Sequence, residues 1–152
     1  MRYASFAGTK NCGGEKCSAV LTIFLMDSKQ LGNFGEKIAC QYLEQKGYKI
    51  LDRNYVKELS AVLKGEIDVI AKKGGIISFI EVKASKDFPG RAFSPEDRVN
   101  YPKQRQIIKI AQMWLGEKKI PLDSKWQIDV VAVRIDLATK KAKIRHLENA
   151  FC

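Results

Sequence analysis

Apolar residues recur with helical spacing between residues 28 and 46. They follow one another at steps of three and four residues, at Leu31, Phe34, Ile38, Ala39, Tyr42 and Leu43. This spacing places them on one face of an α-helix. Asp27 or Ser28 can cap the start of the helix, and Gly47 ends it. The pattern therefore predicts an amphipathic helix that packs on a core.

Two runs rich in isoleucine and valine flank the paired glycines at positions 74 and 75 and predict a β-hairpin over residues 65–83. A two-residue turn places Asp68 opposite Glu81, and Glu66 opposite Lys83, on one face of the sheet. A four-residue turn shifts the pairing by two and keeps Asp68, Glu81 and Lys83 on that face, whereas a three-residue turn would separate them. The prediction therefore depends on an even number of turn residues.

Further runs predict strands at residues 48–55, 126–136 and 143–147, and a second helix that begins near Pro102 and ends near Gly116. The element order is then α-β-β-β-α-β-β. This order predicts an α/β fold with a central mixed sheet flanked by helices. Residues 84–100 show no periodicity and predict a long loop, which is uncommon in compact domains unless it is functional or disordered.

The acidic residues of the hairpin stand on otherwise apolar strands, so their grouping needs a reason. Two carboxylates at cross-strand distance repel, so either one is protonated or a cation lies between them. Mg²⁺ prefers carboxylate, carbonyl and water oxygens, and Asp68, Glu81 and the Val82 carbonyl offer three ligands. Lys83 would lie beside the ion and orient or deprotonate a bound water, as in metal-assisted phosphodiester hydrolysis.

A plainer interpretation of the hairpin is a solvent-facing surface on which Glu66 and Lys83 form a cross-strand ion pair. Glu36 on the first helix could reach the site or face water, and its position alone favours water. Asp129 lies in an apolar strand, and we interpret it as structural, paired with a lysine or arginine. It is nevertheless the main rival of Glu36 as a further acidic member of the site.

The chain has 152 residues and a formal net charge of +10, with a pI near 9.5, and this balance points to a polyanionic partner. An acidic membrane surface is the weaker alternative, and no apolar run is long enough to span a bilayer. The single histidine and the four cysteines follow no zinc-ligand pattern. We expect reduced thiols and a cytoplasmic protein.

Residues 1–25 have no sustained period. We expect them to form a poorly ordered N-terminal extension that contributes little to folding, ahead of a domain over residues 26–152. The loop 84–100 begins at the proposed site and carries Lys86, Arg91 and Arg98, which suits a flap closing on a phosphate backbone; an ordinary surface loop is the alternative. Lys103 in the first turn of the second helix opposes the helix dipole, and a docked anion would relieve that conflict.

The order of elements, with Asp68 on one strand and Glu81-Val82-Lys83 on the next, resembles the restriction-endonuclease-like PD-(D/E)XK nucleases. More closely, the chain from about Leu31 onward resembles the YraN family, whose members are described as candidate endonucleases. The resemblance rests on a set of short motifs: Gly35-Glu36, Gly47-Tyr48, Arg53-Asn54, Gly65-Glu66-Ile67-Asp68, Glu81-Val82-Lys83, Lys103-Gln104 and Asn149-Ala150-Phe151.

That family is similar to archaeal Holliday-junction resolvases. The resemblance implies metal ligation by Asp68 and Glu81, a catalytic Lys83, a further acidic contribution from Glu36 and a phosphate contact from Arg53. It also implies a restriction-endonuclease-like fold and, because resolvases cut two strands symmetrically, a homodimer.

Together these features predict an endonuclease that depends on Mg²⁺ or Mn²⁺ and cuts DNA, most readily structured or branched DNA. The alternative is a nucleic-acid-binding module that keeps the nuclease fold and the basic surface without cleavage. The acid-acid-lysine set is complete in this chain. A degenerate binder would be expected to have lost at least one member, so the sequence favours the enzyme.

Overall fold

The computed structural model describes residues 2–5, 23, 25–58, 64–87, 101–136 and 141–150. Within these ranges it forms β1 (Arg2–Ser5), α2 (Ser28–Gln45), β2 (Lys49–Glu58), β3 (Lys64–Lys73), β4 (Ile76–Asp87), α3 (Tyr101–Glu117), β5 (Trp126–Asp136) and β6 (Lys141–Leu147). From residue 28 onward this is the predicted order α-β-β-β-α-β-β, so the prediction of an α/β fold is confirmed.

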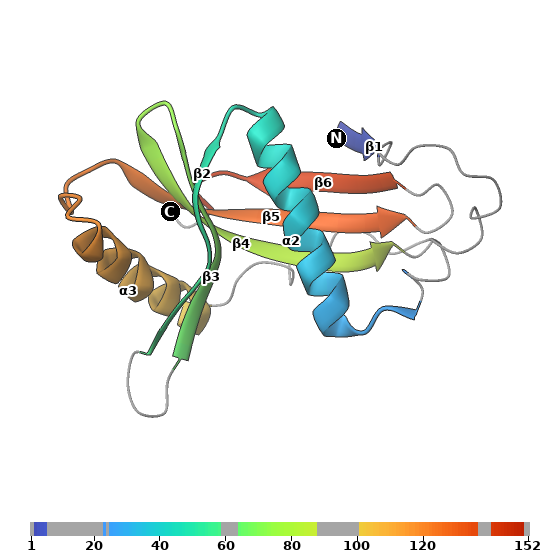
Figure 1. The fold of residues 1–152 in the computed structure, drawn as a ribbon, viewed down its shortest axis with the longest axis horizontal. Coiled ribbons are helices and arrows are strands. Elements are labelled where there is room, and N and C mark those ends of the chain that lie inside the picture. Colours follow the sequence, from blue (N-terminus) through green and yellow to red (C-terminus); the bar gives the residue numbers. More distant parts are fainter. Residues whose placement is uncertain are drawn as a thin grey trace.

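The described strands make one mixed sheet in the order β1-β6-β5-β4-β3-β2 (Figure 1). β4 and β5 run parallel at its centre, and the other neighbouring pairs are antiparallel. A parallel pair needs a crossover connection, and α3 lies within it. The central position of β4 brings the segment that carries Glu81 and Lys83 into the middle of the molecule.

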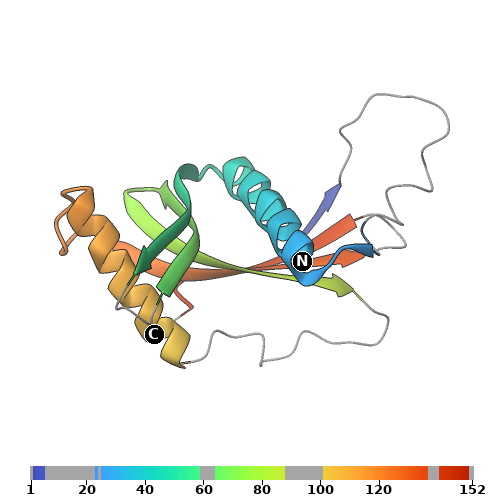
Figure 2. The ribbon, with the colours of Figure 1, turned by 60° about the horizontal axis from the view of Figure 1, so that its bottom comes forward.

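The two helices lie on opposite faces of the sheet (Figures 1 and 2). α2 crosses β4, β5 and β6 and buries Ile38, Ala39 and Leu43 against one apolar cluster, as its periodicity predicts. α3 buries Ile107 and Trp114 in a second cluster on the other face. This arrangement explains why β4 and β5 are apolar on both faces.

The β3–β4 hairpin has the predicted two-residue turn. Gly74 and Gly75 have φ values of 56° and 82°, which side chains rarely adopt, and Lys73 pairs with Ile76. The pairing continues in the predicted register as far as Val69 and Ile80. The register prediction is confirmed over this part of the hairpin.

Past that point β3 parts from β4. β3 stays paired with β2 as far as Lys64, whereas β4 stays paired with β5 as far as Asp87. Both views show β2 and β3 curving away from β4 toward α3 (Figures 1 and 2). We call the place past Val69 and Ile80, where the two strands separate, the fork.

Two glycines allow close packing beside the fork. A Cβ on Gly35 of α2 would meet the Cβ of Ala84 at 2.3 Å, so its absence lets the helix approach β4. A Cβ on Gly65 of β3 would meet the Cδ1 of Ile110 at 2.1 Å, so its absence lets the strand approach α3. The glycines hold both helices against the two strands that separate.

Several predicted boundaries are wrong. Residues 84–87 belong to β4 and not to a loop, because their backbone pairs with β5 through Asp87. β2 continues to Glu58, and β6 begins at Lys141. The sequence analysis did not predict β1, which pairs with residues 141–144 of β6. The rest of the predicted extension, apart from residues 23 and 25, and residues 88–100 lie outside the described residues.

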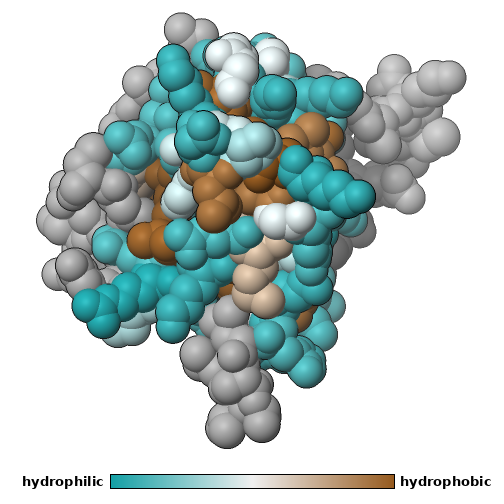
Figure 3. Space-filling view, turned by 90° about the vertical axis from the view of Figure 1, so that its left-hand side faces the viewer, coloured by the Kyte–Doolittle hydropathy of each residue, from teal (hydrophilic) through white to brown (hydrophobic). Residues whose placement is uncertain are grey.

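The face that Figure 3 shows, beside the end of α3, mixes apolar and hydrophilic side chains. Met113 and Leu122 are large apolar residues with exposed fractions of 39% and 62%.

In the described part of the chain, neither helix has the length and apolar character needed to cross a bilayer.

Candidate functional site

The fork brings Asp68 and Glu81 together. Asp68 directly precedes Val69, the first residue of β3 that pairs with β4, and its Oδ2 accepts a hydrogen bond of 2.7 Å from the backbone N–H of Val82. The Asp68 carboxylate thus binds the β4 backbone where the strands separate. Asp68 therefore lies against the segment of β4 that carries Glu81, although the Val82 group that it contacts is the N–H and not the carbonyl predicted as a metal ligand.

Glu81 is buried, with an exposed fraction of 5%, and faces two ammonium groups. Lys83 Nζ lies 2.9 Å from Oε1 and donates a hydrogen bond to it. Lys103 Nζ, from the first turn of α3, lies 3.3 Å from Oε2. This second contact is an ion pair without hydrogen-bond geometry, and among the described residues Oε2 accepts no hydrogen bond.

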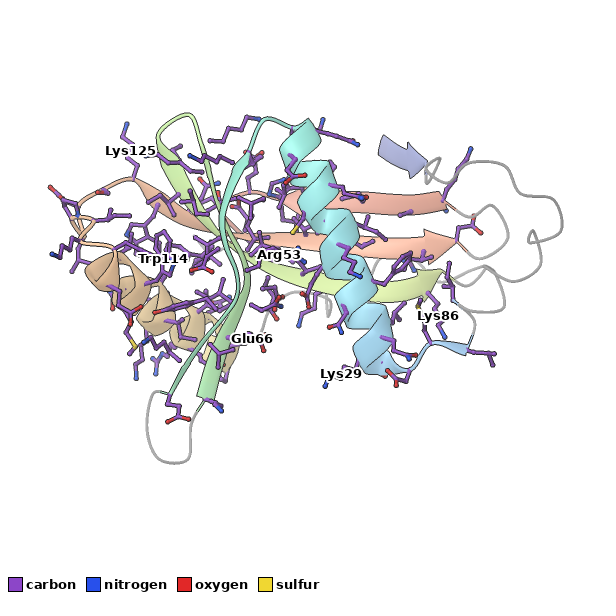
Figure 4. All side chains as sticks on the ribbon, viewed as in Figure 1. Lys29, Arg53, Glu66, Lys86, Trp114 and Lys125 are labelled. Carbon is purple, nitrogen blue, oxygen red and sulfur yellow. The ribbon has the colours of Figure 1, made fainter. Side chains whose placement is uncertain are left out.

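This arrangement corrects one alternative from the sequence. The plainer interpretation pairs Lys83 with Glu66 across the strands, but the ladder between β3 and β4 ends before those positions. Lys83 instead contacts Glu81 on its own strand, and Glu66 is exposed on the part of β3 that has left β4 (Figure 4). The charges of the hairpin therefore gather at Glu81.

Asp68 has a perturbed acidity. Burial of its carboxyl group, and then the nearby negative charge of Glu81, raise its pKa to about 7, although the hydrogen bond from the Val82 N–H opposes the shift. A carboxyl group with such a pKa changes its charge near neutral pH, and a cation between Asp68 and Glu81 would favour the charged form.

Glu36 approaches the site from α2 and is held by a residue of β2. The Asn54 side-chain amide donates a hydrogen bond of 2.7 Å to Glu36 Oε2. Asn54 has a φ of 48°, in the left-handed region that asparagine tolerates better than most residues. The Glu36 charge is close enough to contribute to the raised pKa of Asp68. The structure therefore brings the Glu36 charge within electrostatic range of Asp68.

Asp129, the rival of Glu36, lies in a separate polar cluster. It is fully buried and accepts hydrogen bonds from the Gln127 side chain at 2.9 Å and the Asn149 backbone N–H at 2.8 Å. His146 Nε2 lies 3.3 Å from its other oxygen. These contacts fit the interpretation of Asp129 as a structural residue, but its hydrogen-bond partners among the described residues are not the lysine or arginine that we expected.

The predicted phosphate contacts occupy different places. Arg53 is exposed on β2, and its guanidinium opposes the rise that burial causes in the pKa of Cys40 on α2. Lys86 lies toward the far end of β4, where its Nζ donates to the Met26 carbonyl at 3.1 Å (Figure 4). Lys103 contacts Glu81 inside the site. Arg91 and Arg98 lie outside the described residues.

The residues at the fork fit a divalent cation in part. No three histidine, cysteine or acidic side chains of the described chain come together as a ready metal-binding group. However, Mg²⁺ is commonly held by one or two carboxylates together with water and substrate oxygens. Asp68 and Glu81 provide two carboxylates, and the buried Glu81 Oε2 lacks a hydrogen bond. This donor set suits a hard cation completed by water and phosphate.

Two features of the site were missed in the sequence. Asn54 holds Glu36, and the Arg53-Asn54 pair drew attention only to Arg53. Lys103 was expected to meet a docked anion, yet it forms an ion pair with Glu81. Its position in the first turn of a helix after a long connection gave no indication of which strand it would reach.

Comparison with other sequences identifies related proteins. The sequence pattern of the family described as "Uncharacterised protein family UPF0102" matches residues 35–133. A UPF0102 protein of Alkaliphilus oremlandii is 40% identical over 124 residues, which cover 82% of this chain and 99% of the relative. UPF0102 proteins of Clostridium beijerinckii and Clostridium tetani are 36% and 40% identical over 124 residues, which cover 82% of this chain and 94% and 95% of those relatives.

Proposed function

The chain belongs to the UPF0102 family, also called YraN, and from this family and the geometry of the fork we propose that it is a metal-dependent nuclease. Its substrate is DNA, and branched or otherwise structured DNA in particular. One observation carries the proposal: at the fork Asp68 binds the backbone N–H of Val82, the residue after Glu81, and Lys83 Nζ lies 2.9 Å from Glu81 Oε1.

Asp68, Glu81 and the Val82 carbonyl are the groups that would hold Mg²⁺ or Mn²⁺. The ion would polarise the phosphodiester and make a bound water more nucleophilic. The raised pKa of Asp68 supports this assignment, because burial and the Glu81 charge disfavour the ionised carboxylate, and a cation between the two carboxylates would offset both effects. Glu81 Oε2 supports it as well, because this buried oxygen accepts no hydrogen bond from the described residues and has only the ion pair with Lys103 there.

The other residues of the site position water and phosphate. The Lys83 ammonium is half exposed, so it can donate to Glu81 and still reach a water at the edge of the site. Glu36, held by Asn54, can accept a hydrogen bond from that water and help to orient it. Arg53 is exposed on β2 and can contact a phosphate next to the one that reacts.

The net charge of +10 supports a nucleic-acid substrate, because lysine and arginine side chains displace the counterions that surround phosphates. We place the activity in the cytoplasm, where DNA is available and where thiols such as the free, buried Cys40 stay reduced. A homodimer would allow two sites to cut two strands symmetrically.

One observation favours the second candidate function, a binding module without cleavage. The Glu81 carboxylate already faces two ammonium groups, from Lys83 and Lys103, and two cations can neutralise a buried acid without a metal. In that case the fork would be a charged anchor between β4 and α3, and the basic surface alone would bind nucleic acid.

Cleavage of a panel of DNAs tests the two functions. Purified protein is incubated with linear, flapped and four-way DNAs in Mg²⁺, in Mn²⁺ and in a chelator, beside Asp68→Asn. The nuclease account predicts metal-dependent cleavage of the branched DNAs, lost with chelator and reduced at least about a hundredfold in Asp68→Asn. Binding of every DNA by the wild type with no cleavage under any condition would support the binding module instead.

A further inference from the structure

Glu81 has a different ammonium group on each of its two oxygens. Lys83, two residues later on the same strand, donates to Oε1, whereas Lys103 of α3 faces Oε2. The two contacts differ in geometry, because the Lys83 contact is a hydrogen bond of 2.9 Å and the Lys103 contact is an ion pair at 3.3 Å without one. The contact of Lys103 with Glu81 is therefore the weaker of the two contacts.

The Glu81 oxygen that faces Lys103 is also the one that accepts no hydrogen bond from the part of the chain that the structure describes. A buried carboxylate oxygen without a hydrogen bond is costly, and a nearby positive charge is the means by which it is tolerated. A divalent ion coordinated by this oxygen would lie about 2 Å from it. The ion and the Lys103 ammonium would then compete for one oxygen at distances where like charges repel strongly.

We propose that Lys103 is an internal counter-ion of the metal-free site, which a divalent cation displaces from Glu81 and which then contacts an anionic oxygen of the bound DNA. This inference rests on the proposed function. It assigns Lys103 a positioning role in the metal-free protein and a substrate contact in the metal-bound one. The Lys103 side chain, exposed at 30%, lies at the edge of the site and has a route toward solvent-borne phosphate.

The inference makes metal and DNA bind cooperatively. Without metal, Lys103 neutralises Glu81 and contributes little to DNA binding. With metal, its ammonium becomes available to phosphate, so each ligand increases the affinity for the other by the same factor. Removal of the ammonium should have two opposite effects, because it increases metal affinity and reduces the gain in DNA affinity that metal causes.

Calorimetric titration with Mn²⁺ in the absence of DNA tests the first effect. Lys103→Met should bind Mn²⁺ about tenfold more tightly than the wild type, because a competing charge a few ångströms from the ion is removed. Lys103→Arg should keep the wild-type affinity. Lys109→Met, which removes an exposed charge elsewhere on α3, is the control for long-range electrostatics and should change affinity less than about twofold.

The second effect is tested by measuring the DNA affinity of the same variants in Ca²⁺ and in chelator. Ca²⁺ is chosen because it should slow cleavage. The gain in affinity that Ca²⁺ causes should be at least about fivefold smaller in Lys103→Met than in the wild type. Equal Mn²⁺ affinity in Lys103→Met and wild type, or an equal gain with Ca²⁺, would overturn the inference and leave the nuclease proposal standing. If no protein binds Mn²⁺, both proposals are overturned.

Discussion

At the scale of single residues, the acidity of Asp68 is the property with the clearest consequence. Its carboxyl group has a pKa of about 7 in the folded protein, against an ordinary value of 3.8, because of burial and the Glu81 charge. Between these values the folded protein holds a proton that the unfolded chain releases. The free energy of unfolding that this proton contributes is therefore fully present below pH 3.8, the ordinary pKa, and is lost as the pH rises through the folded pKa of about 7.

Asp68→Asn should remove this pH dependence, because asparagine does not ionise. In the presence of chelator, the variant should gain on the order of 1–3 kcal/mol in free energy of unfolding relative to the wild type between pH 5 and pH 8. Urea unfolding of both proteins at the two pH values measures the difference. A difference between the proteins that is the same at pH 5 and pH 8 would show that Asp68 has an ordinary pKa.

The sequence predicts the central residues of the site but not their supports. Asp68, Glu81 and Lys83 could be grouped in advance because the paired glycines specify the turn, and strand alternation then specifies the face. Asn54 and Lys103 could not be assigned to the site in advance. The contact of Asn54 depends on its backbone in the left-handed region, and the contact of Lys103 depends on how α3, distant in sequence, packs on the sheet.

At the scale of elements, the position of α2 depends on Gly35. An added Cβ there would meet the Cβ of Ala84 at 2.3 Å, so the helix would have to move away from β4. Gly32 is the matched control on the same helix, because an added Cβ at Gly32 meets nothing within 4 Å. Comparing alanine at the two positions therefore separates the effect of helix propensity on stability from the effect of the clash with Ala84.

Gly35→Ala should lower the free energy of unfolding by about 1–3 kcal/mol through this clash and reduce activity, because Glu36 moves with the helix. Gly32→Ala should instead raise it by about 0.5–1 kcal/mol, the usual gain of alanine over glycine in a helix. Thermal unfolding of both variants measures these changes. Equal effects of the two substitutions would mean that α2 does not need to approach β4 closely.

The cluster of Asp129 joins β5 to the C-terminal turn. Asp129→Ala should destabilise the protein by about 2–4 kcal/mol, because it leaves the Asn149 N–H and the Gln127 amide without their acceptor. Its affinity for Mn²⁺, measured on the folded protein, should equal that of the wild type. A large loss of metal affinity in this variant would show that Asp129 contributes to the metal site.

Elements with a clear period or turn signal could be predicted from the sequence, whereas those determined by distant partners could not. The helix over 28–45 and the hairpin carry such signals. Residues 84–87 lack alternation of their own and are strand because β5 pairs with them. The four residues of β1 are too few to show a period, and their partner is near the other end of the chain.

At the scale of the whole molecule, the formal net charge of +10 should dominate the proposed binding of nucleic acid. DNA affinity should fall steeply with salt concentration and vary little with base sequence, because phosphate contacts release counterions and do not read bases. Fluorescence anisotropy measures the affinity for several duplexes of different sequence. The salt concentration is varied between about 50 and 200 mM, the range over which binding that depends on phosphate contacts weakens strongly. Binding that ignores salt, or that selects one sequence on plain duplex, would contradict this.

The nuclease account requires that Lys83 acts on the attacking water without being a metal ligand. The most direct test is the single-turnover cleavage rate of Lys83→Met on four-way DNA in Mg²⁺ or Mn²⁺, measured beside its metal-dependent DNA affinity. We expect the rate to fall by about two orders of magnitude or more, the range typical of losing a positioned acid–base group, while the affinity stays within about threefold of the wild type. Cleavage by Lys83→Met at the wild-type rate would contradict the account.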